Sequence, residues 1–246
     1  MKIKITRDPY EYYDYLYEKN YINLRKNSIT CFIGCNGSGK TTLLNSIKNR
    51  LMKECVVKVI KKDFYSGMVD NLVRVLSGEE EKRPDLYLIE FNKRTDITNN
   101  YNDHFFNSFE QNYSSTGEGV AIRFGKYASL IGGAISKLHD CKLMIMFDDC
   151  DAGTDISMIS EIKGILDLIV KDCKERNIEY YIMLTSNSFE MARGMNCVSV
   201  HDFSKHKFTD YEDYKSFVLD SRIKKNKRIE EAKNNEESIS KCSDEG

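Results

Sequence analysis

Residues 34–41 read GCNGSGKT, between the apolar run SITCFIG (28–34) and the segment TTLLNSIKNRLMK (41–53). The stretch matches the pattern GxxxxGK[ST] at every position and has its required context, a buried strand before it and a helix after it. Small residues let successive backbone N–H groups converge on phosphate oxygens, and the N-terminus of the following helix adds the positive end of its dipole. We call residues 34–41 the phosphate loop and expect it to bind nucleotide within an α/β fold.

The side chains of the phosphate loop have distinct expected roles. Lys40 is placed to neutralise the β- and γ-phosphates of a nucleotide, and the Thr41 hydroxyl to bind Mg²⁺. A glycine-rich turn of purely structural use would have no reason to place Lys and Thr together at its end. The residues expected to surround the phosphates are Asn36, Gly37, Ser38, Gly39, Lys40, Thr41 and Thr42.

A second magnesium ligand is expected at the end of another strand. The segment KLMIMFDD (142–149) is a continuous apolar run ending in two carboxylates, as in a buried parallel strand. Asp148 and Asp149 could merely begin a turn, but two adjacent carboxylates repel each other without a cation. We therefore assign Asp148 to Mg²⁺ and expect Asp149 to polarise the attacking water.

The remaining patterns alternate between strands and helices. This alternation predicts an α/β sandwich around a mostly parallel central sheet flanked by helices. No linker divides residues 1–209, and residues 210–246 read as a charged helical tail with a disordered end. Strands are expected at 2–6, 28–34, 54–60, 85–91, 142–149 and 179–187, and helices at 8–20, 41–53, 68–76, 120–138 and 156–173.

Composition excludes several classes of protein. The chain of 246 residues is 41% hydrophobic and 30% charged, as in soluble globular proteins, and its net charge of −1 gives no global basic field for nucleic acid. It has neither the run of about 20 apolar residues needed to span a bilayer nor a signal-peptide pattern. Eight cysteines without a CxxC pair indicate reduced thiols. We expect a cytoplasmic protein without membrane insertion.

The stretch SSTGEG (114–119) precedes a long helical pattern. On its own it is typical of a helix cap. Together with GCNGSGKTT (34–42) and FDDCDAGTD (147–155), however, its SxGE letters resemble the ATP-binding-cassette (ABC) ATPase superfamily. The likeness covers roughly residues 20–205 and is greatest to the soluble branch of chromosome-maintenance, recombination and small stand-alone phage or bacterial ATPases.

This resemblance implies a P-loop NTPase fold of ABC type, with ATP and Mg²⁺ as ligands and a helical signature subregion at about 92–140. Ser115 and Gly117 would contact the γ-phosphate of ATP held by a second copy, so a homodimer should form on ATP binding. Asp148 matches the Walker B aspartate, Asp149 the catalytic glutamate, and Asp155 the D-loop aspartate. A closer letter match, LSGEE at 76–80, is followed by a charged loop and not by an apolar-striped helix.

Several positions depart from the family pattern. Asp149 is one methylene shorter than glutamate, which predicts slow hydrolysis. Ser186, with Asn187 beside it, replaces the switch histidine; either could hydrogen-bond a γ-phosphate, but neither carries a positive charge near neutral pH. Asn92 is the candidate for the Q-loop position. Ser115 also lies 33 residues before Asp148, farther than in transporter cassettes.

Three functions stay open at this point. The first is an ATPase whose dimer cycle moves an unknown protein or nucleic-acid partner. The second is a regulatory module in which ATP serves mainly for assembly, and the third is a transporter cassette, which the departures disfavour. The basic run RIKKNKR (222–228) favours a solvated helix face over a DNA contact. If it does bind DNA, affinity should fall steeply with salt.

Overall fold

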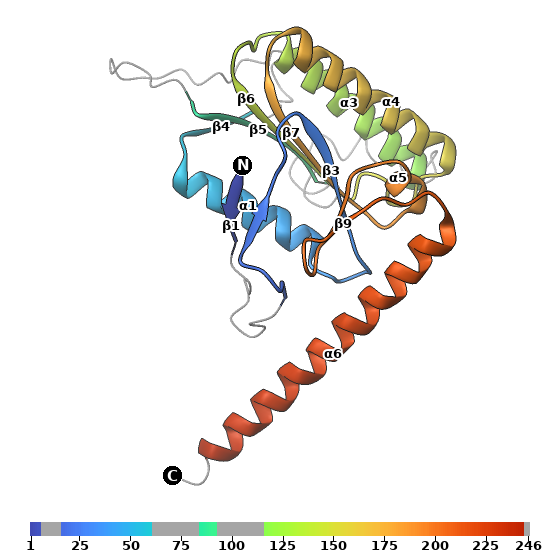
Figure 1. Ribbon diagram of the computed structural model, residues 1–246. Coiled ribbons are helices and arrows are strands. Elements are labelled where there is room, and N and C mark those ends of the chain that lie inside the picture. Colours follow the sequence, from blue (N-terminus) through green and yellow to red (C-terminus); the bar gives the residue numbers. More distant parts are fainter. Residues whose placement is uncertain (6–15, 61–83, 93–115, 244–246) are drawn as a thin grey trace, which may run out of the picture.

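A mixed β-sheet lies between two layers of helices in the computed structural model, which describes residues 1–5, 16–60, 84–92 and 116–243 (Figure 1). Within these ranges the sheet has the order β4-β5-β6-β7-β3-β8-β9, and all neighbouring strands are parallel except the antiparallel pair β8 and β9. The predicted α/β class with a mostly parallel sheet is therefore confirmed. The strands are β3 (Ser28–Ile33), β4 (Val57–Val59), β5 (Leu86–Asn92), β6 (Lys142–Asp148), β7 (Glu179–Ser186), β8 (Cys197–Ser199) and β9 (Lys205–His206).

The helices cover both faces of this sheet. Helix α1 (Lys40–Glu54) lies on one face, together with the hairpin of β1 (Lys2–Lys4) and β2 (Tyr21–Asn23). Helices α3 (Thr116–Ile135) and α4 (Ile156–Glu175) pack side by side on the other face (Figure 1). The short helix α5 (Phe189–Ala192) precedes β8, and α6 (Tyr211–Ser243) projects from the body as one long helix.

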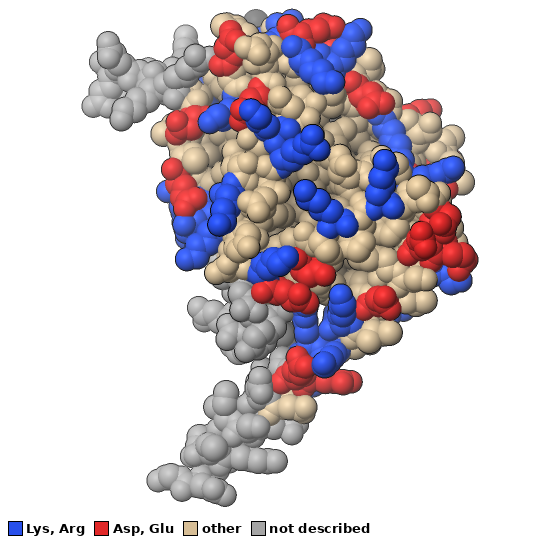
Figure 2. All heavy atoms as spheres, viewed as in Figure 1, with Lys and Arg blue, Asp and Glu red and all other residues tan. Residues whose placement is uncertain are grey.

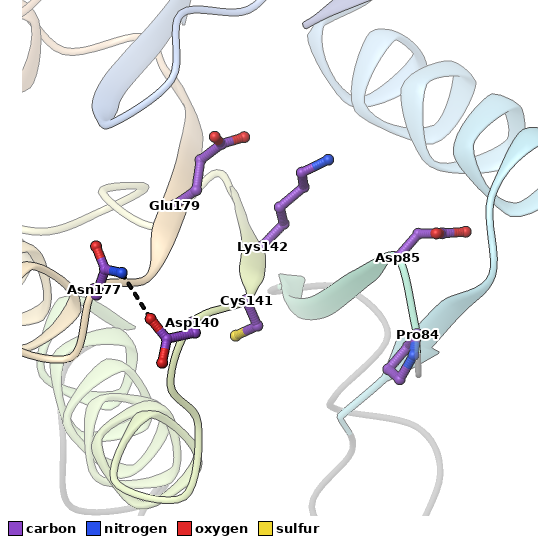
Figure 3. A pocket seen from close by; sticks show the side chains of 7 residues that line it. All are labelled: Pro84, Asp85, Asp140, Cys141, Lys142, Asn177 and Glu179. Carbon is purple, nitrogen blue, oxygen red and sulfur yellow. Dashed lines mark hydrogen bonds between the residues drawn. The ribbon is translucent and has the colours of Figure 1, made fainter. Parts of the chain in front are cut away.

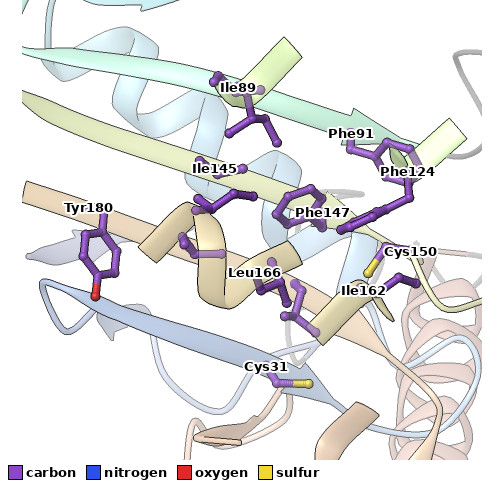
Figure 4. Close-up of a cluster of buried hydrophobic side chains, with 14 of the residues drawn as sticks. Cys31, Ile89, Phe91, Phe124, Ile145, Phe147, Cys150, Ile162, Leu166 and Tyr180 are labelled. Atoms are coloured by element: carbon purple, nitrogen blue, oxygen red, sulfur yellow. The ribbon is translucent and has the colours of Figure 1, made fainter. Parts of the chain in front are cut away.

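Strand β6 shows why the sheet is buried on both faces. Leu143, Ile145 and Phe147 point into the core beneath α3 and α4, while Met144 and Met146 point towards α1. Figure 4 shows the cluster of buried side chains beneath α3 and α4, to which both the sheet and the helices contribute residues. Because each fully buried side chain of this kind contributes about 1.5–3 kcal/mol, an unbroken apolar run stabilises a strand only where helices cover both faces.

The strand order brings the predicted site residues to one edge. Strand β7 lies between β3 and β6, and parallel strands end at the same side of the sheet. The phosphate loop follows β3, Asp148 ends β6, and Ser186 ends β7. Ligands of open α/β sheets bind in the crevice outside the carboxyl ends of such strands.

Helices α3 and α4 each bury apolar side chains against the sheet. On α4, Ile159, Ile162, Leu166, Ile169 and Cys173 are buried, but Ile156 is 67% exposed because it is the first residue of the helix. On α3, Phe124, Ile131 and Ile135 are buried, and Leu138 is buried just after the helix ends. The side chains of Val120 and Tyr127 lie outside the described residues, as do the whole predicted helix 68–76 and LSGEE.

Other elements were not predicted or differ in length. Strands β2, β8 and β9 and helix α5 had no sequence prediction. Helix α6 continues to Ser243, into the end of the tail that the sequence predicts to be disordered. Across the described ranges, no helix combines the length and the apolar character needed to cross a membrane.

Candidate functional site

The backbone of the phosphate loop requires its glycines. Gly37 and Gly39 have φ values of 72° and 91°, in the left-handed region that only glycine adopts without strain. A Cβ atom on Gly34 would lie 2.6 Å from the Ser38 Oγ atom. Because glycine is the N-cap of α1, that residue has no side chain to cap the first N–H groups of the helix. These donors therefore face the loop, as in an anion-binding site.

Ser38 adds an independent sign of a ligand. Its side chain is 1% exposed, and its Oγ atom has no hydrogen-bond partner among the described residues. A buried hydroxyl without a partner costs about 1–3 kcal/mol, so native structures rarely leave one unpaired. A phosphate oxygen bound in the loop would supply the missing acceptor.

Lys40 is buried beneath the same loop. Its Nζ atom donates to the carbonyl oxygens of Gly34 at 3.0 Å and Cys35 at 3.1 Å, and to Oδ1 of Asn187 at 2.6 Å. Burial lowers the pKa of Lys40, and the nearby carboxylates of β6 and its following turn oppose that shift. The ammonium group is therefore held at the site by neutral acceptors that a phosphate oxygen could replace.

Asp148 connects the phosphate loop to β6 and β7. Its Oδ1 atom accepts hydrogen bonds from the Thr41 hydroxyl at 3.1 Å and from the Thr185 hydroxyl at 2.8 Å. Thr185 Oγ1 in turn accepts the Asp149 N–H at 2.8 Å. The structure thus brings together the two residues predicted to hold Mg²⁺.

This pair suits Mg²⁺ in the presence of phosphate oxygens. Mg²⁺ usually takes one or two protein ligands and fills its octahedron with water and substrate phosphate. Among the described residues, no group of three or more His, Cys, Asp or Glu side chains could hold a metal. Thr41 and Asp148 together supply the one or two oxygen ligands that Mg²⁺ usually takes from a protein.

Asp149 stands in an unusual backbone conformation. Its φ is 58°, a left-handed value that Asp and Asn tolerate better than most residues. The residue is half-buried directly after β6, and its N–H is anchored to Thr185. The structure thus places Asp149 directly after Asp148, the residue predicted to hold Mg²⁺, at the carboxyl end of β6.

Ser186 does not reach the phosphate loop. It is fully buried, its Oγ atom donates to the Asp151 carboxylate, and the same oxygen accepts the Ser188 N–H at 2.9 Å. The exposed neighbour Asn187 contacts Lys40 instead. The predicted hydrogen bond from this position to a phosphate is therefore better placed on Asn187 than on Ser186.

Asp151 is a buried carboxylate at the site that the sequence analysis missed. Burial raises its pKa from 3.8 to about 6, and the hydrogen bond from Ser186 partly opposes that shift. The only sequence signal was a third acidic residue soon after Asp148 and Asp149. The position of Asp151 belongs to none of the motifs named above. Its burial depends on contacts with the end of β7, which the local sequence does not reveal.

The other predicted residues lie around this edge. Asp155 is the N-cap of α4, where it accepts the Met158 N–H at 2.9 Å and the Ser157 hydroxyl at 2.8 Å. The Met158 hydrogen bond is the main cause of its lowered pKa. Gly117 lies in the first turn of α3, and Ser115 falls just outside the described residues. Asn36 is exposed in the loop, Thr42 lies in the first turn of α1, and the Asn92 backbone pairs with Asp148.

A separate pocket lies at the opposite edge of the sheet, where β5, β6 and β7 begin (Figure 3). It has a volume of about 480 Å³, and on one side of it Asn177 Nδ2 donates to Asp140 Oδ1 at 2.6 Å. None of the predicted site residues lines it. The lining residues are Pro84, Asp85, Asp140, Cys141, Lys142, Asn177 and Glu179.

Charges on the molecular surface are mixed. On the face shown in Figure 2, basic and acidic side chains are interspersed over the body and form no broad field of one sign. The basic run 222–228 lies on α6, where Lys227 pairs with Glu231 and Arg228 with Glu18. The run is therefore not a continuous unpaired surface for nucleic acid.

Comparisons with known proteins give no functional assignment, so any assignment depends on the residues of the candidate site. No protein-family model matches the sequence, and no curated protein matches it.

Proposed function

We propose that this protein is a Mg²⁺-dependent ATPase of ABC type, with a P-loop NTPase fold, that forms a head-to-tail homodimer around two ATP molecules. The observation that carries the proposal is the contact between Thr41 and Asp148, which lie 107 residues apart. Sequence patterns alone assigned both residues to one magnesium ion, and they meet beside Lys40. The unpaired Ser38 hydroxyl in the same loop supports an anionic ligand.

Each residue would have a defined part in the reaction. The loop N–H groups and Lys40 would bind the phosphates, and the Thr41 hydroxyl and Asp148 carboxylate would hold Mg²⁺. Bound Mg²⁺ would neutralise charge that develops on the phosphate oxygens. Asp149 would accept a hydrogen bond from the attacking water and orient it. Asn187, already within reach of Lys40, would replace Ser186 as the polar contact at this end of β7.

The arrangement also supports the dimer. Gly117 lies in the first turn of α3 (Thr116–Ile135), and the N-terminus of a helix is the part best suited to contact a phosphate. Asp155, in the turn after β6, is exposed and available to a second copy. A dimer that needs ATP at its interface would open after hydrolysis, and this motion could act on a protein or nucleic-acid partner.

A second function, an assembly module with little turnover, is supported by one contact. Ser186 is committed to Asp151 and Ser188, so the usual switch position contributes no free polar group. The short Asp149 side chain, which predicts slow hydrolysis, also favours a module with little turnover. In such a module ATP would hold the dimer closed, and hydrolysis would serve only to reset it.

Calorimetric titration of ATP into the full chain with Mg²⁺ tests the proposal. Lys40→Ala should weaken ATP binding roughly 30-fold, because a buried ammonium loses its charge-assisted contacts with phosphate. Lys53→Ala is the matched control, since Lys53 is an exposed residue in the last turn of the same helix. If the wild type does not bind ATP, or Lys40→Ala binds it as the control does, the proposal is wrong.

A further inference from the structure

Helix α6 contacts the phosphate loop directly. The Cys35 N–H donates to Ser221 Oγ at 3.1 Å, and Lys225 Nζ donates to the Asn36 carbonyl at 3.0 Å. A Cβ atom on Gly37 would lie only 2.7 Å from that Nζ atom. The lysine ammonium therefore occupies space that the glycine leaves open, although 189 residues separate Lys225 from Asn36.

A buried histidine fixes α6 in this position. His201 Nδ1 lies 2.9 Å from Arg228 Nη1, and since arginine can only donate, Nδ1 accepts and the ring proton is on Nε2. That Nε2 atom is 3.0 Å from Ser221 Oγ. Arg228 also pairs with Glu18 at 3.0 Å. Positions 221, 225 and 228 share one helix face, so Lys225 is held against the loop from both sides.

Lys225 differs from the basic residues around it. Among the described residues it has no carboxylate partner, and its one hydrogen bond is to the neutral Asn36 carbonyl. A phosphate oxygen carries a negative charge, so it attracts an ammonium group by a Coulomb interaction that the neutral carbonyl does not supply. Its neighbours are paired with acids, Lys224 with Asp202 at 3.9 Å, Lys227 with Glu231 at 3.8 Å, and Arg228 with Glu18 at 3.0 Å.

We propose that Lys225 is a further phosphate-binding residue, which supplies a second ammonium group to a nucleoside triphosphate from outside the nucleotide-binding motifs. The inference rests on the proposed function of the phosphate loop. Lys40 approaches the loop carbonyls of Gly34 and Cys35, and Lys225 approaches the next one, Asn36. A triphosphate in the loop would draw Lys225 from this carbonyl to a phosphate oxygen.

Three substitutions at position 225 distinguish a charge contact between Lys225 and phosphate from a purely structural contact between Lys225 and the loop. Lys225→Gln keeps an N–H donor for the Asn36 carbonyl but removes the charge, Lys225→Arg keeps both, and Lys225→Ala removes both. We expect Lys225→Gln and Lys225→Ala to weaken ATP binding about tenfold, and Lys225→Arg to stay within about threefold of the wild type. Lys227→Ala, the same change on the exposed side of α6, should have little effect.

Calorimetric titration of ATP into the full chain at two salt concentrations measures these differences. The affinity lost in Lys225→Gln should shrink at high salt, because screening weakens a contact between partly exposed charges. If wild type binds ATP through Lys40 but Lys225→Gln binds it equally well, Lys225 only supports the loop and this inference is wrong. If wild type binds no ATP, the proposed function fails and this inference fails with it.

Discussion

The hydroxyl oxygen of Thr41 lies 3.1 Å from Oδ1 of Asp148, at the point where β6 ends against the start of α1. Both groups are oxygen ligands of the kind that Mg²⁺ prefers. Asp148 also accepts the Thr185 hydroxyl at 2.8 Å, so strand β7 fixes the carboxylate from its other side. Both hydrogen bonds need an acceptor oxygen at position 148 and not its charge, so removal of the charge should leave the fold intact.

The first prediction concerns this carboxylate. Asp148→Asn keeps an oxygen that accepts the threonine hydroxyls but removes the negative charge that Mg²⁺ needs. We expect the gain in ATP affinity that Mg²⁺ provides to fall at least about tenfold, while binding in EDTA changes little. Titrations with Mg²⁺ and with EDTA measure both values. Asp167→Asn, on the exposed side of α4, is the control. If Mg²⁺ raises the ATP affinity of Asp148→Asn as much as that of the wild type, Asp148 is not a Mg²⁺ ligand.

The second prediction separates hydrolysis from dimer formation. Asparagine tolerates the left-handed φ of 58° at position 149 as aspartate does, so Asp149→Asn should fold normally. It should lose ATP hydrolysis yet form a stable dimer with Mg-ATP, because the magnesium site stays and the residue that orients water is lost. Size-exclusion chromatography with light scattering and a phosphate-release assay measure these two properties.

A third substitution tests the shared site itself. Ser115→Arg should bind ATP in its own phosphate loop but stay monomeric, because a large charged side chain replaces the hydroxyl offered to the second copy. ATP titration and light scattering on the same sample give both results. If Ser115→Arg dimerises with ATP as the wild type does, residues 115–118 do not complete a partner's site.

The fourth prediction uses two glycines with the same backbone conformation. Gly37 and Gly194 have φ values of 72° and 75°, so alanine at either position should cost about 1–2 kcal/mol of folding free energy. Among the described residues, no atom beyond the chain neighbours lies within 4 Å of a Cβ on Gly194, whereas a Cβ on Gly37 meets the flexible end of Lys225. Urea denaturation should therefore give similar losses, but only Gly37→Ala should weaken ATP binding. Equal ATP affinity in the two variants would contradict the role given to this turn.

The sequence allowed prediction of the elements whose burial follows a simple pattern. Residues 142–149 read as a buried strand because both faces of β6 are covered, and the phosphate loop marks the junction of β3 and α1. Strands β8 and β9 have three and two residues, too few for a period of two to be visible. Their pairing depends on neighbours distant in sequence.

The same distinction applies to the candidate site. Lys40 and Thr41 could be proposed because a phosphate loop fixes their type and spacing, and Asp148 because it ends a continuous apolar strand; the structure brings Thr41 and Asp148 into contact. Asp151 and Lys225 could not be found in that way. The burial of Asp151 depends on its contact with the end of β7, and the position of Lys225 depends on how α6 lies on the body.

The last prediction concerns the pH dependence of stability through Asp151. Its pKa is raised from 3.8 to about 6, mainly by burial, so the native state holds this proton more tightly than the unfolded chain. The stabilisation is complete below about pH 4 and is lost as pH rises through about 6. The difference amounts to about 3 kcal/mol. Asp151→Asn keeps an oxygen acceptor for Ser186 but has no proton to release.

Urea denaturation of the wild type and Asp151→Asn between pH 4 and pH 7 tests this sign. The stability of Asp151→Asn relative to the wild type should rise by about 2.4 kcal/mol across that range, because only the wild type must ionise a buried carboxylate. Other titrating groups, including His201 with its pKa lowered to about 4 by burial, are common to both proteins and cancel in the difference. A difference that stays constant with pH would mean that Asp151 is ionised in the native protein throughout, held by Lys40 more strongly than its burial opposes.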